Sequence, residues 1–237
     1  MKNVNKNNSI FFDFKNHFLN KGVDYSFYRG WSSLIVIKCN MQKASILKME
    51  KIIKLFPEID NKEKFLVVTN GKLQDNTKIK KKYLLPYDVI NSFSSFKKLE
   101  IISKKKSEFF LISAKTKSKT NKKMNFFNIK KDIKPKNLWG GKCISRPYEG
   151  KDIHLVLFNL KKGFKFNDNG HVNEQITWLK KGEMKFYSGK KNKKLKTNQG
   201  IDVGYFHKHG GLSKGAIGFD VFFPKRKESK YKNSPPS

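Results

Sequence analysis

Histidines supply most of the chemistry that this sequence could perform. Among its 237 residues there are five histidines, and imidazole both binds divalent cations and exchanges protons near neutral pH. His171, His207 and His209 lie near glycines that mark turns in the last third of the chain. His17 and His154 stand alone, and a lone histidine more often has a structural role. We therefore expect any metal or acid–base site to lie in the last third of the chain.

Three side chains around His171 have the spacing of one face of a β-strand. Asn169, His171 and Gln175 are separated by two and four residues, and residues at such intervals point to the same side of an extended chain. Thr177 continues this face. Glu174 falls on the opposite face, which makes its carboxylate a poor ligand in spite of its charge. The sequence thus predicts that an imidazole and two amides face a common interior.

An internal repeat indicates the elements that position these residues. The segment 63–73 aligns with 174–184 at an offset of 111 residues, and at the same offset 109–115 aligns with 220–226. In both copies, short runs of β-branched and aromatic residues are separated by turn signals such as Thr69-Asn70-Gly71. This pattern predicts two all-β units, each of them a sandwich or a barrel.

The composition along the chain sets the expected domain boundaries. The stretch 115–137 is rich in Lys, Ser, Thr and Asn, and we interpret it as the region that links the two units. We expect one domain over residues 1–120 and a second over residues 121–226. The charged segment 227–237 ends in Pro-Pro-Ser and is predicted to be a disordered tail.

The residues around His171 resemble a known motif. The series Gly163-x5-Asn169-x-His171-x3-Gln175-x6-Gly182 has the spacing of the first cupin motif. Its Glu-Gln pair is similar to that of a sub-group of cupins in which the glutamine is a metal ligand. The resemblance to the cupin superfamily implies an all-β fold of two tandem cupin barrels, that is, double-stranded β-helices or jelly rolls.

The second cupin motif is reduced to His209, although the segment 218–226 resembles the closing strand of small cupins. The resemblance implies a divalent metal ion (Zn, Ni, Fe or Mn) held by His171, Gln175 and His209. Asn169 stands where the family has its first histidine and would be a weaker ligand, because an amide oxygen is a poorer donor than imidazole. Three roles stay open for His207: a substitute metal ligand, an acid–base group beside the metal, or a loop side chain.

The repeat offset predicts that the first unit holds no metal. The positions equivalent to the candidate ligands are occupied by Glu58, Asp60, Lys64 and Lys98. A charged ammonium group has no lone pair and repels a cation. We therefore expect the first unit to be a degenerate cupin that supports the fold, contributes to dimerisation or walls the active barrel.

The resemblance implies a metal-dependent enzyme of the lyase or isomerase type that acts on a small anionic, oxygen-rich molecule such as a sugar acid. His207 and Tyr205 are its candidate acid–base groups, and Thr177 and Arg146 are candidates for binding the substrate. Three alternatives are a non-catalytic bicupin that binds a sugar or small metabolite, a cupin dioxygenase, and a dimethylsulfoniopropionate lyase, because a fold does not determine a reaction.

The composition argues against several other classes of protein. The chain has 52 Lys and Arg against 19 Asp and Glu, a formal charge of +33, but arginine occurs only at Arg29, Arg146 and Arg226. Base-reading surfaces generally use more arginine, so a polyanion-binding protein is the weaker alternative and we expect no specific nucleic-acid partner. Because the sequence offers neither a membrane-spanning stretch nor a secretory signal, we expect a cytoplasmic protein, either a homodimer or a monomer.

Overall fold

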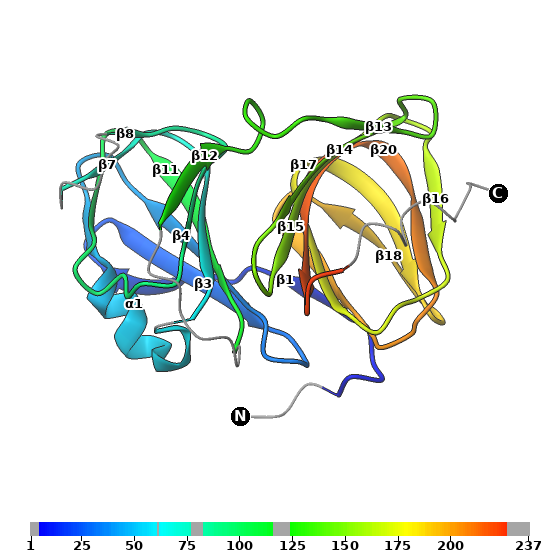
Figure 1. Cartoon of the computed structure of the whole chain (residues 1–237), viewed down its shortest axis with the longest axis horizontal. Coiled ribbons are helices and arrows are strands. Elements are labelled where there is room, and N and C mark those ends of the chain that lie inside the picture. The colour runs from blue at the N-terminus through cyan, green and yellow to red at the C-terminus, as the bar shows by residue number, and fades with distance from the viewer. Residues whose placement is uncertain (1–4, 61, 77–82, 116–123, 227–237) are drawn as a thin grey trace. The chain divides into compact units, whose positions relative to one another are not determined.

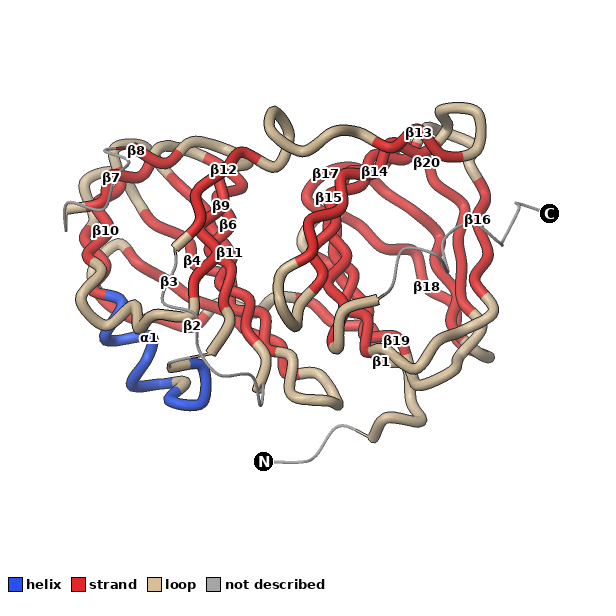
Figure 2. Tube along the Cα trace, viewed as in Figure 1, coloured by secondary structure: helices blue, strands red, loops and turns tan. Residues whose placement is uncertain are grey.

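The structure is a computed structural model that describes residues 5–60, 62–76, 83–115 and 124–226. The segment 227–237, for which we expected disorder, lies outside the described residues. Strands dominate, and within the described residues helical turns are confined to α1 (Met49–Leu55) and the 3-10 turn η1 (Pro57–Ile59) (Figure 2). None of the helices in this part of the chain is long and apolar enough to cross a membrane.

The chain divides into two compact units. The C-terminal unit contains Met1–Asp13, Gly30–Ser32 and Ile133–Ser237, and the N-terminal unit contains Phe14–Arg29 and Ser33–Asp132. The first strand of the chain therefore belongs to the C-terminal unit. The domain limits at residues 120 and 226 that we expected from composition stay a prediction.

The C-terminal unit is a nine-stranded antiparallel sheet that curls around an interior (Figure 1). Its main path runs in the order β1, β19, β17, β20, β15, β14, β13, while β16 pairs with β20 and β18 pairs with β17. The strands are β1 (Ile10–Asp13), β13 (Lys136–Leu138), β14 (Cys143–Glu149), β15 (His154–Leu160), β16 (Lys165–Asp168), β17 (Glu174–Ser188), β18 (Lys191–Lys196), β19 (Gln199–Val203) and β20 (His209–Phe223).

The N-terminal unit has a seven-stranded sheet in the order β12, β9, β6, β11, β4, β3, β2 and a four-stranded sheet in the order β5, β10, β7, β8. The strands of the larger sheet are β2 (His17–Asn20), β3 (Val23–Arg29), β4 (Ile35–Met41), β6 (Lys64–Asn70), β9 (Asp88–Ser92), β11 (Ser107–Ser113) and β12 (Asn125–Asn128). Those of the smaller sheet are β5 (Ile46–Lys48), β7 (Leu73–Asp75), β8 (Tyr83–Leu84) and β10 (Glu100–Ser103).

The two units repeat one order of strands, which explains the repeat in the sequence. β6 and β11 are central neighbours in the N-terminal unit, as β17 and β20 are in the C-terminal unit, and β9 and β4 flank them as β19 and β15 do. β1 pairs with β19 where β12 pairs with β9, so a strand from the start of the chain completes the C-terminal sheet. The predicted duplication of an all-β unit is therefore confirmed.

The two faces of β17 have different surroundings. Gln175 and Thr177 line a cavity in the C-terminal unit. On the opposite face, the carboxylate of Glu174 accepts a hydrogen bond from the backbone N–H of Ser32 at 3.1 Å, and Trp178 stacks on Phe219 with ring centroids 5.4 Å apart. The alternation of a β-strand thus separates the packing face of β17 from the face whose polar side chains line the cavity.

Lys64 is a buried cation in the N-terminal unit, at the repeat position of Gln175. Its side chain is 0% exposed, and its Nζ donates hydrogen bonds to the carbonyl oxygens of Lys62 at 2.8 Å and Ser94 at 3.0 Å. Burial lowers the pKa of Lys64 to about 8, and the charge of Asp60 opposes part of this shift. In the N-terminal unit, an amine that is hydrogen-bonded to two carbonyls therefore stands where the C-terminal unit has the amide of Gln175.

The buried amine predicts a specific dependence of stability on pH. Between about pH 8 and pH 10.4 the unfolded chain holds a proton on Lys64 that the folded chain has released, so the free energy of unfolding rises with pH. Over this range, the free energy of unfolding of the wild-type protein should rise by at most about 3 kcal/mol relative to that of Lys64→Met. Urea unfolding followed by circular dichroism measures the difference. Lys54→Met, on an exposed side chain, is the control and should show no such gain. If the difference in the free energy of unfolding between wild type and Lys64→Met stays constant with pH, this account is wrong.

Candidate metal centre

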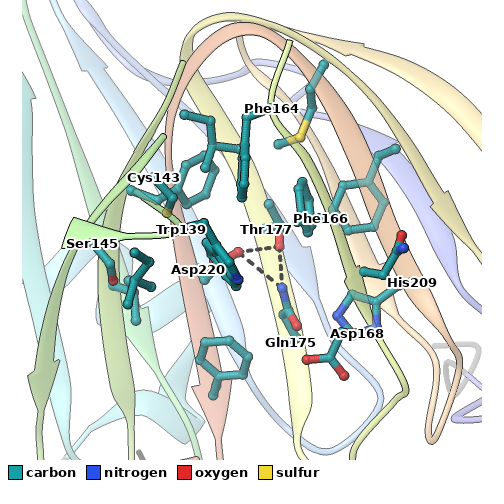
Figure 3. Close-up of a pocket in the computed structure, with 18 of the residues that line it drawn as sticks. Trp139, Cys143, Ser145, Phe164, Phe166, Asp168, Gln175, Thr177, His209 and Asp220 are labelled. Carbon is teal, nitrogen blue, oxygen red and sulfur yellow. Dashed lines mark hydrogen bonds between the residues drawn. The ribbon is translucent and has the colours of Figure 1, made fainter. Parts of the chain in front are cut away.

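The interior of the C-terminal unit holds a cavity of about 110 Å³. Its walls come from β14, β15, β16, β17 and β20 and from the turn after β13 (Figure 3). One part of the lining is polar and includes Asp168, Gln175, Thr177, His209, Asp220 and Arg226. The other part is apolar and includes Trp139, Val156, Phe158, Phe164, Phe166 and Phe186.

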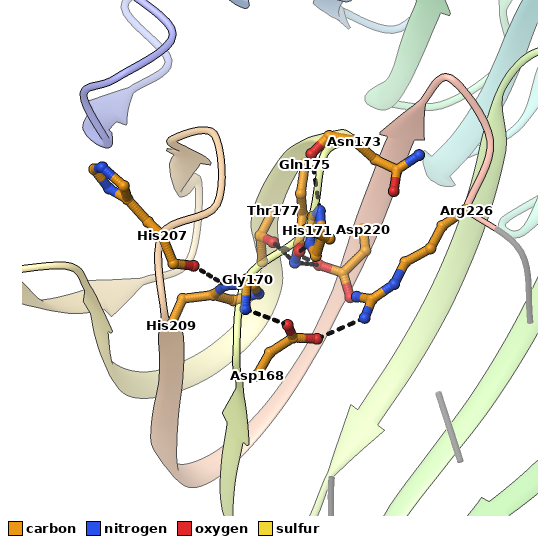
Figure 4. A network of polar contacts seen from close by, with 10 residues as sticks. All are labelled: Asp168, Gly170, His171, Asn173, Gln175, Thr177, His207, His209, Asp220 and Arg226. Carbon is orange, nitrogen blue, oxygen red and sulfur yellow. Dashed lines mark hydrogen bonds and ion pairs between the residues drawn. The ribbon is translucent and has the colours of Figure 1, made fainter. Parts of the chain in front are cut away.

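Backbone carbonyls fix the tautomers of two buried histidines beside this cavity. Nδ1 of His171 lies 2.9 Å from the carbonyl oxygen of Asn173, and Nδ1 of His209 lies 2.9 Å from that of His207 (Figure 4). A carbonyl only accepts hydrogen bonds, so each Nδ1 carries a proton and each Nε2 of the neutral rings keeps its lone pair. The ring centroids are 5.2 Å apart. Histidines that bind metals are usually held in this way.

The amide of Gln175 turns its oxygen toward His171. Its Nε2 donates hydrogen bonds to Thr177 Oγ1 at 3.0 Å and to Asp220 Oδ1 at 3.2 Å. The remaining amide atom, Oε1, lies 3.0 Å from His171 Nε2. The reverse orientation of the amide would set its oxygen against the carboxylate of Asp220. His171 Nε2 and Gln175 Oε1, which both carry lone pairs and no proton, therefore face each other at hydrogen-bond distance.

Burial removes the simplest way of satisfying this pair of acceptors. A doubly protonated imidazole could donate to Gln175, but burial lowers the pKa of His171 to about 4. The charges of Arg226 and His209 act in the same direction, and the hydrogen bond with Gln175 opposes them. The ring of His171 is thus neutral at neutral pH. A cation between the two lone pairs would satisfy both, so this donor set fits a divalent metal ion.

Asp168 adds an anionic group to the two imidazoles. The potential ligand atoms of Asp168, His171 and His209 all lie within 4.8 Å of one another. One carboxylate oxygen of Asp168 accepts a hydrogen bond from the backbone N–H of Gly170, and the other accepts one from Arg226, both at 2.8 Å. Burial alone would raise the pKa of Asp168, but the charges of His209 and Arg226 and these hydrogen bonds lower it. Asp168 is therefore an ionised candidate ligand.

A second carboxyl group, that of Asp220, lines the cavity next to Gln175. Thr177 Oγ1 donates to its Oδ1 at 2.5 Å. Burial raises the pKa of Asp220 to about 6, although the hydrogen bonds from Thr177 and Gln175 oppose the shift. Asp220 is one of the residues that line the cavity. A molecule bound in the cavity would therefore meet Asp220.

Some of the site residues expected from the sequence lie together, and others do not. Gln175, His209 and Thr177 line the cavity, and His171 contacts both Gln175 and His209. Asn169 is exposed and lies outside the lining, because β16 ends at the preceding residue and the strand alternation stops there. The structure places the carboxylate of Asp168 beside the imidazoles.

The candidate catalytic pair and Arg146 also lie outside the cavity lining. Nδ1 of His207 is 2.8 Å from Ser9 Oγ, and Figure 4 shows its ring directed away from the cluster. The ring of Tyr205 packs edge-on against Trp31, with centroids 6.0 Å apart. Ser145, which precedes Arg146 in β14, lines the cavity. Successive residues of a strand face opposite sides, so the side chain of Arg146 is on the other face of the sheet.

Sequence reasoning missed Asp168, Arg226 and Asp220. Asp168 directly precedes Asn169 within the motif, and its negative charge was the feature that could have indicated a metal ligand there. Asp220 lies opposite Thr177 in the register of β17 and β20, which becomes known only with the strand pairing. Arg226 forms its ion pair with Asp168 across 58 positions of the sequence, and no local pattern indicates such a contact.

No family model matches the sequence, and no curated protein matches it either. Among solved structures, AerE from Microcystis aeruginosa is similar with a TM-score of 0.71 at 12% identity, covering 91% of this chain and 99% of that chain. Ylba from E. coli has a TM-score of 0.71 at 13% identity, with 95% of each chain covered. Bacillus subtilis oxalate decarboxylase, studied for its Mn(II) centres, has a TM-score of 0.66 at 8% identity, covering 92% of this chain and 78% of that chain.

At such low identities, these similarities establish the fold and not the activity. The chain therefore has the cupin fold, in two tandem barrels.

Proposed function

We propose that the C-terminal unit is a metal-dependent enzyme of the lyase or isomerase type that acts on a small anionic molecule. The observation that carries this proposal is the gathering of His171 with His209, Asp168 and Gln175, the last three of which line one cavity. No proton lies between the lone pairs of His171 Nε2 and Gln175 Oε1. The similarity to a structure with Mn(II) centres supports the same interpretation.

The four side chains offer two imidazole nitrogens, a carboxylate and an amide oxygen. This set suits Zn, Ni, Fe or Mn, because these metals accept both nitrogen and oxygen ligands. When bound, the ion would act as a Lewis acid on a carbonyl or carboxylate oxygen of the substrate. The carboxylate of Asp168 would strengthen the binding of a cation beyond what two imidazoles and two amides provide.

Other residues of the cavity have roles of their own in this proposal. The guanidinium group of Arg226 would attract a carboxylate, since it lies in the lining beside Asp168. Thr177 and Asp220 present a hydroxyl and a carboxyl group next to Gln175. With a substrate bound, the apolar walls would help to exclude water, which would strengthen the electrostatic interactions at the polar end.

A non-catalytic bicupin that binds a small metabolite is the second candidate. It is favoured by the positions of His207 and Tyr205, because both of the expected acid–base groups lie outside the cavity lining. The cavity then supplies binding groups without the residues that the sequence suggested for proton transfer.

Metal binding provides the first prediction. The wild-type protein, stripped and then reloaded with Mn(II) or Zn(II), should retain close to one ion per chain by elemental analysis. His171→Ala and His209→Ala should each weaken binding by at least about tenfold, because each removes an imidazole ligand. His207→Ala is the matched control and should bind like the wild type, because its carbonyl and not its ring supports His209. Equal losses in all three variants would contradict the proposed ligand set.

A second pair of variants distinguishes two adjacent residues. Asp168→Asn should weaken metal binding roughly 10- to 100-fold, because it removes the anionic ligand while keeping the size of the side chain. Asn169→Ala should leave the affinity nearly unchanged, because Asn169 is exposed and lies outside the cavity. Competition with a fluorescent chelator measures both affinities. The opposite ranking would restore Asn169 as the ligand.

Turnover tests the enzymatic part of the proposal. The metal-loaded protein is incubated in D₂O with a panel of small 2-hydroxy, 2-oxo, sugar and aromatic acids, and proton NMR records deuterium incorporation or new products. We expect at least one acid to react, and we expect His171→Ala to abolish the reaction because it removes a candidate ligand. Binding of an acid without any reaction across the panel would favour the non-catalytic bicupin.

A further inference from the structure

A continuous series of aromatic rings follows one wall of the cavity. The ring of Trp139 lies 5.2 Å from that of Phe164, which stacks on Phe166 at 6.1 Å. Phe166 meets Phe186 edge-on at 5.9 Å, and Phe186 stacks on the imidazole of His209 at 6.1 Å. The series therefore connects the turn after β13 with a candidate metal ligand (Figure 3).

Strands β15 and β17 add further apolar groups to the lining. β15 contributes Val156, Phe158 and Leu160, all at most 6% exposed, and β17 contributes Met184. Alternate residues of β15 point to the same side, which explains why three of them reach the cavity. Away from the polar end, a bound molecule meets mainly carbon and sulfur atoms.

The polar groups of the cavity largely satisfy one another. Asp168 is paired with Arg226, and Gln175 and Thr177 are both bonded to Asp220. These five residues lie at the polar end, where a carboxylate would also bind. Two further polar side chains of the lining, Ser145 and Asn167, are not part of this group. A hydroxyl group placed against the rings of Phe164, Phe166 and Phe186 would lose its bonds to water without gaining a partner from those rings, and such a loss opposes binding.

The size of the cavity limits what it can enclose. Its volume is about 110 Å³. An apolar protein cavity of roughly 150 Å³ accommodates a benzene molecule. The present cavity is smaller than that but is not fully enclosed, so it can take up a short branched chain, or a single ring of which part stays at the opening.

We propose that the molecule bound in this cavity is a carboxylate with an apolar body, a single ring or a short branched chain, rather than a polyhydroxylated acid. This inference rests on the proposed function for the anionic end of the molecule and specifies the rest of it. The carboxylate lies at the polar end beside Arg226, and the apolar body lies against Phe164 and Phe166. The sugar acid that the sequence suggested fits this cavity poorly.

Benzoate and threonate are a matched pair of probes, because both are monoanions with the same number of non-hydrogen atoms. Isothermal titration calorimetry with the Zn(II)-loaded full-length protein gives the dissociation constant of each. We expect benzoate to bind at least about tenfold more tightly than threonate, because only its ring gains from burial against apolar walls.

Two isosteric variants test where the ring lies. Val156→Thr places a hydroxyl group in the apolar wall at nearly unchanged volume and should weaken benzoate binding by about threefold or more. Val172→Thr is the matched control, because Val172 is 44% exposed and lies outside the cavity lining, and it should bind benzoate like the wild type. Thermal unfolding of both variants verifies that they fold.

The same titrations on the metal-stripped protein separate this inference from the proposed function. A preference for benzoate that persists without metal, in a protein that shows no metal-dependent turnover, would keep the apolar-body inference and remove the enzymatic proposal. Threonate binding as tightly as benzoate, or no benzoate binding up to about 10 mM, would overturn the inference whatever the metal does.

Discussion

Two hydrogen bonds from imidazole to backbone set the tautomers of the two candidate metal-binding histidines in the C-terminal unit. The carbonyl oxygens of Asn173 and His207 each take the Nδ1 proton of a buried histidine, which leaves both Nε2 lone pairs without protons. Gln175 cannot donate to His171, because its NH₂ group is engaged by Thr177 and Asp220. Neutral imidazoles and a carbonyl oxygen that approach one another in this way fit a divalent cation, and the proposed site rests on that fit.

The register of the strands brings these groups together. β16 and β20 pair Asp168 with His209, and β17 and β20 pair Thr177 with Asp220. Residues far apart in the sequence thereby become neighbours on one interior surface. The N-terminal unit repeats the same order of strands but carries the buried amine of Lys64 in place of the amide. A single scaffold thus accommodates either a set of lone pairs or an internal cation, depending on a few inward-facing residues.

The fold could be predicted from the sequence more completely than the site. The repeat and its turn signals predicted a duplicated all-β chain, because strand alternation and turn chemistry are local properties. Alternation also grouped Gln175 with Thr177, both within β17. The same alternation placed Asn169 wrongly on this face. Residues 169–173 lie outside any strand, and side chains alternate with a period of two only within a strand. Arg226 and Asp168 could not be paired in advance, since their contact depends on the closed barrel rather than on neighbouring residues.

The most direct test is anomalous diffraction at the manganese edge from crystals of the full chain soaked in Mn(II). The account predicts one strong peak per chain, in the C-terminal barrel, within about 2.2 Å of Nε2 of both His171 and His209. Peaks only at surface carboxylates, or a peak in the N-terminal barrel alone, would contradict it.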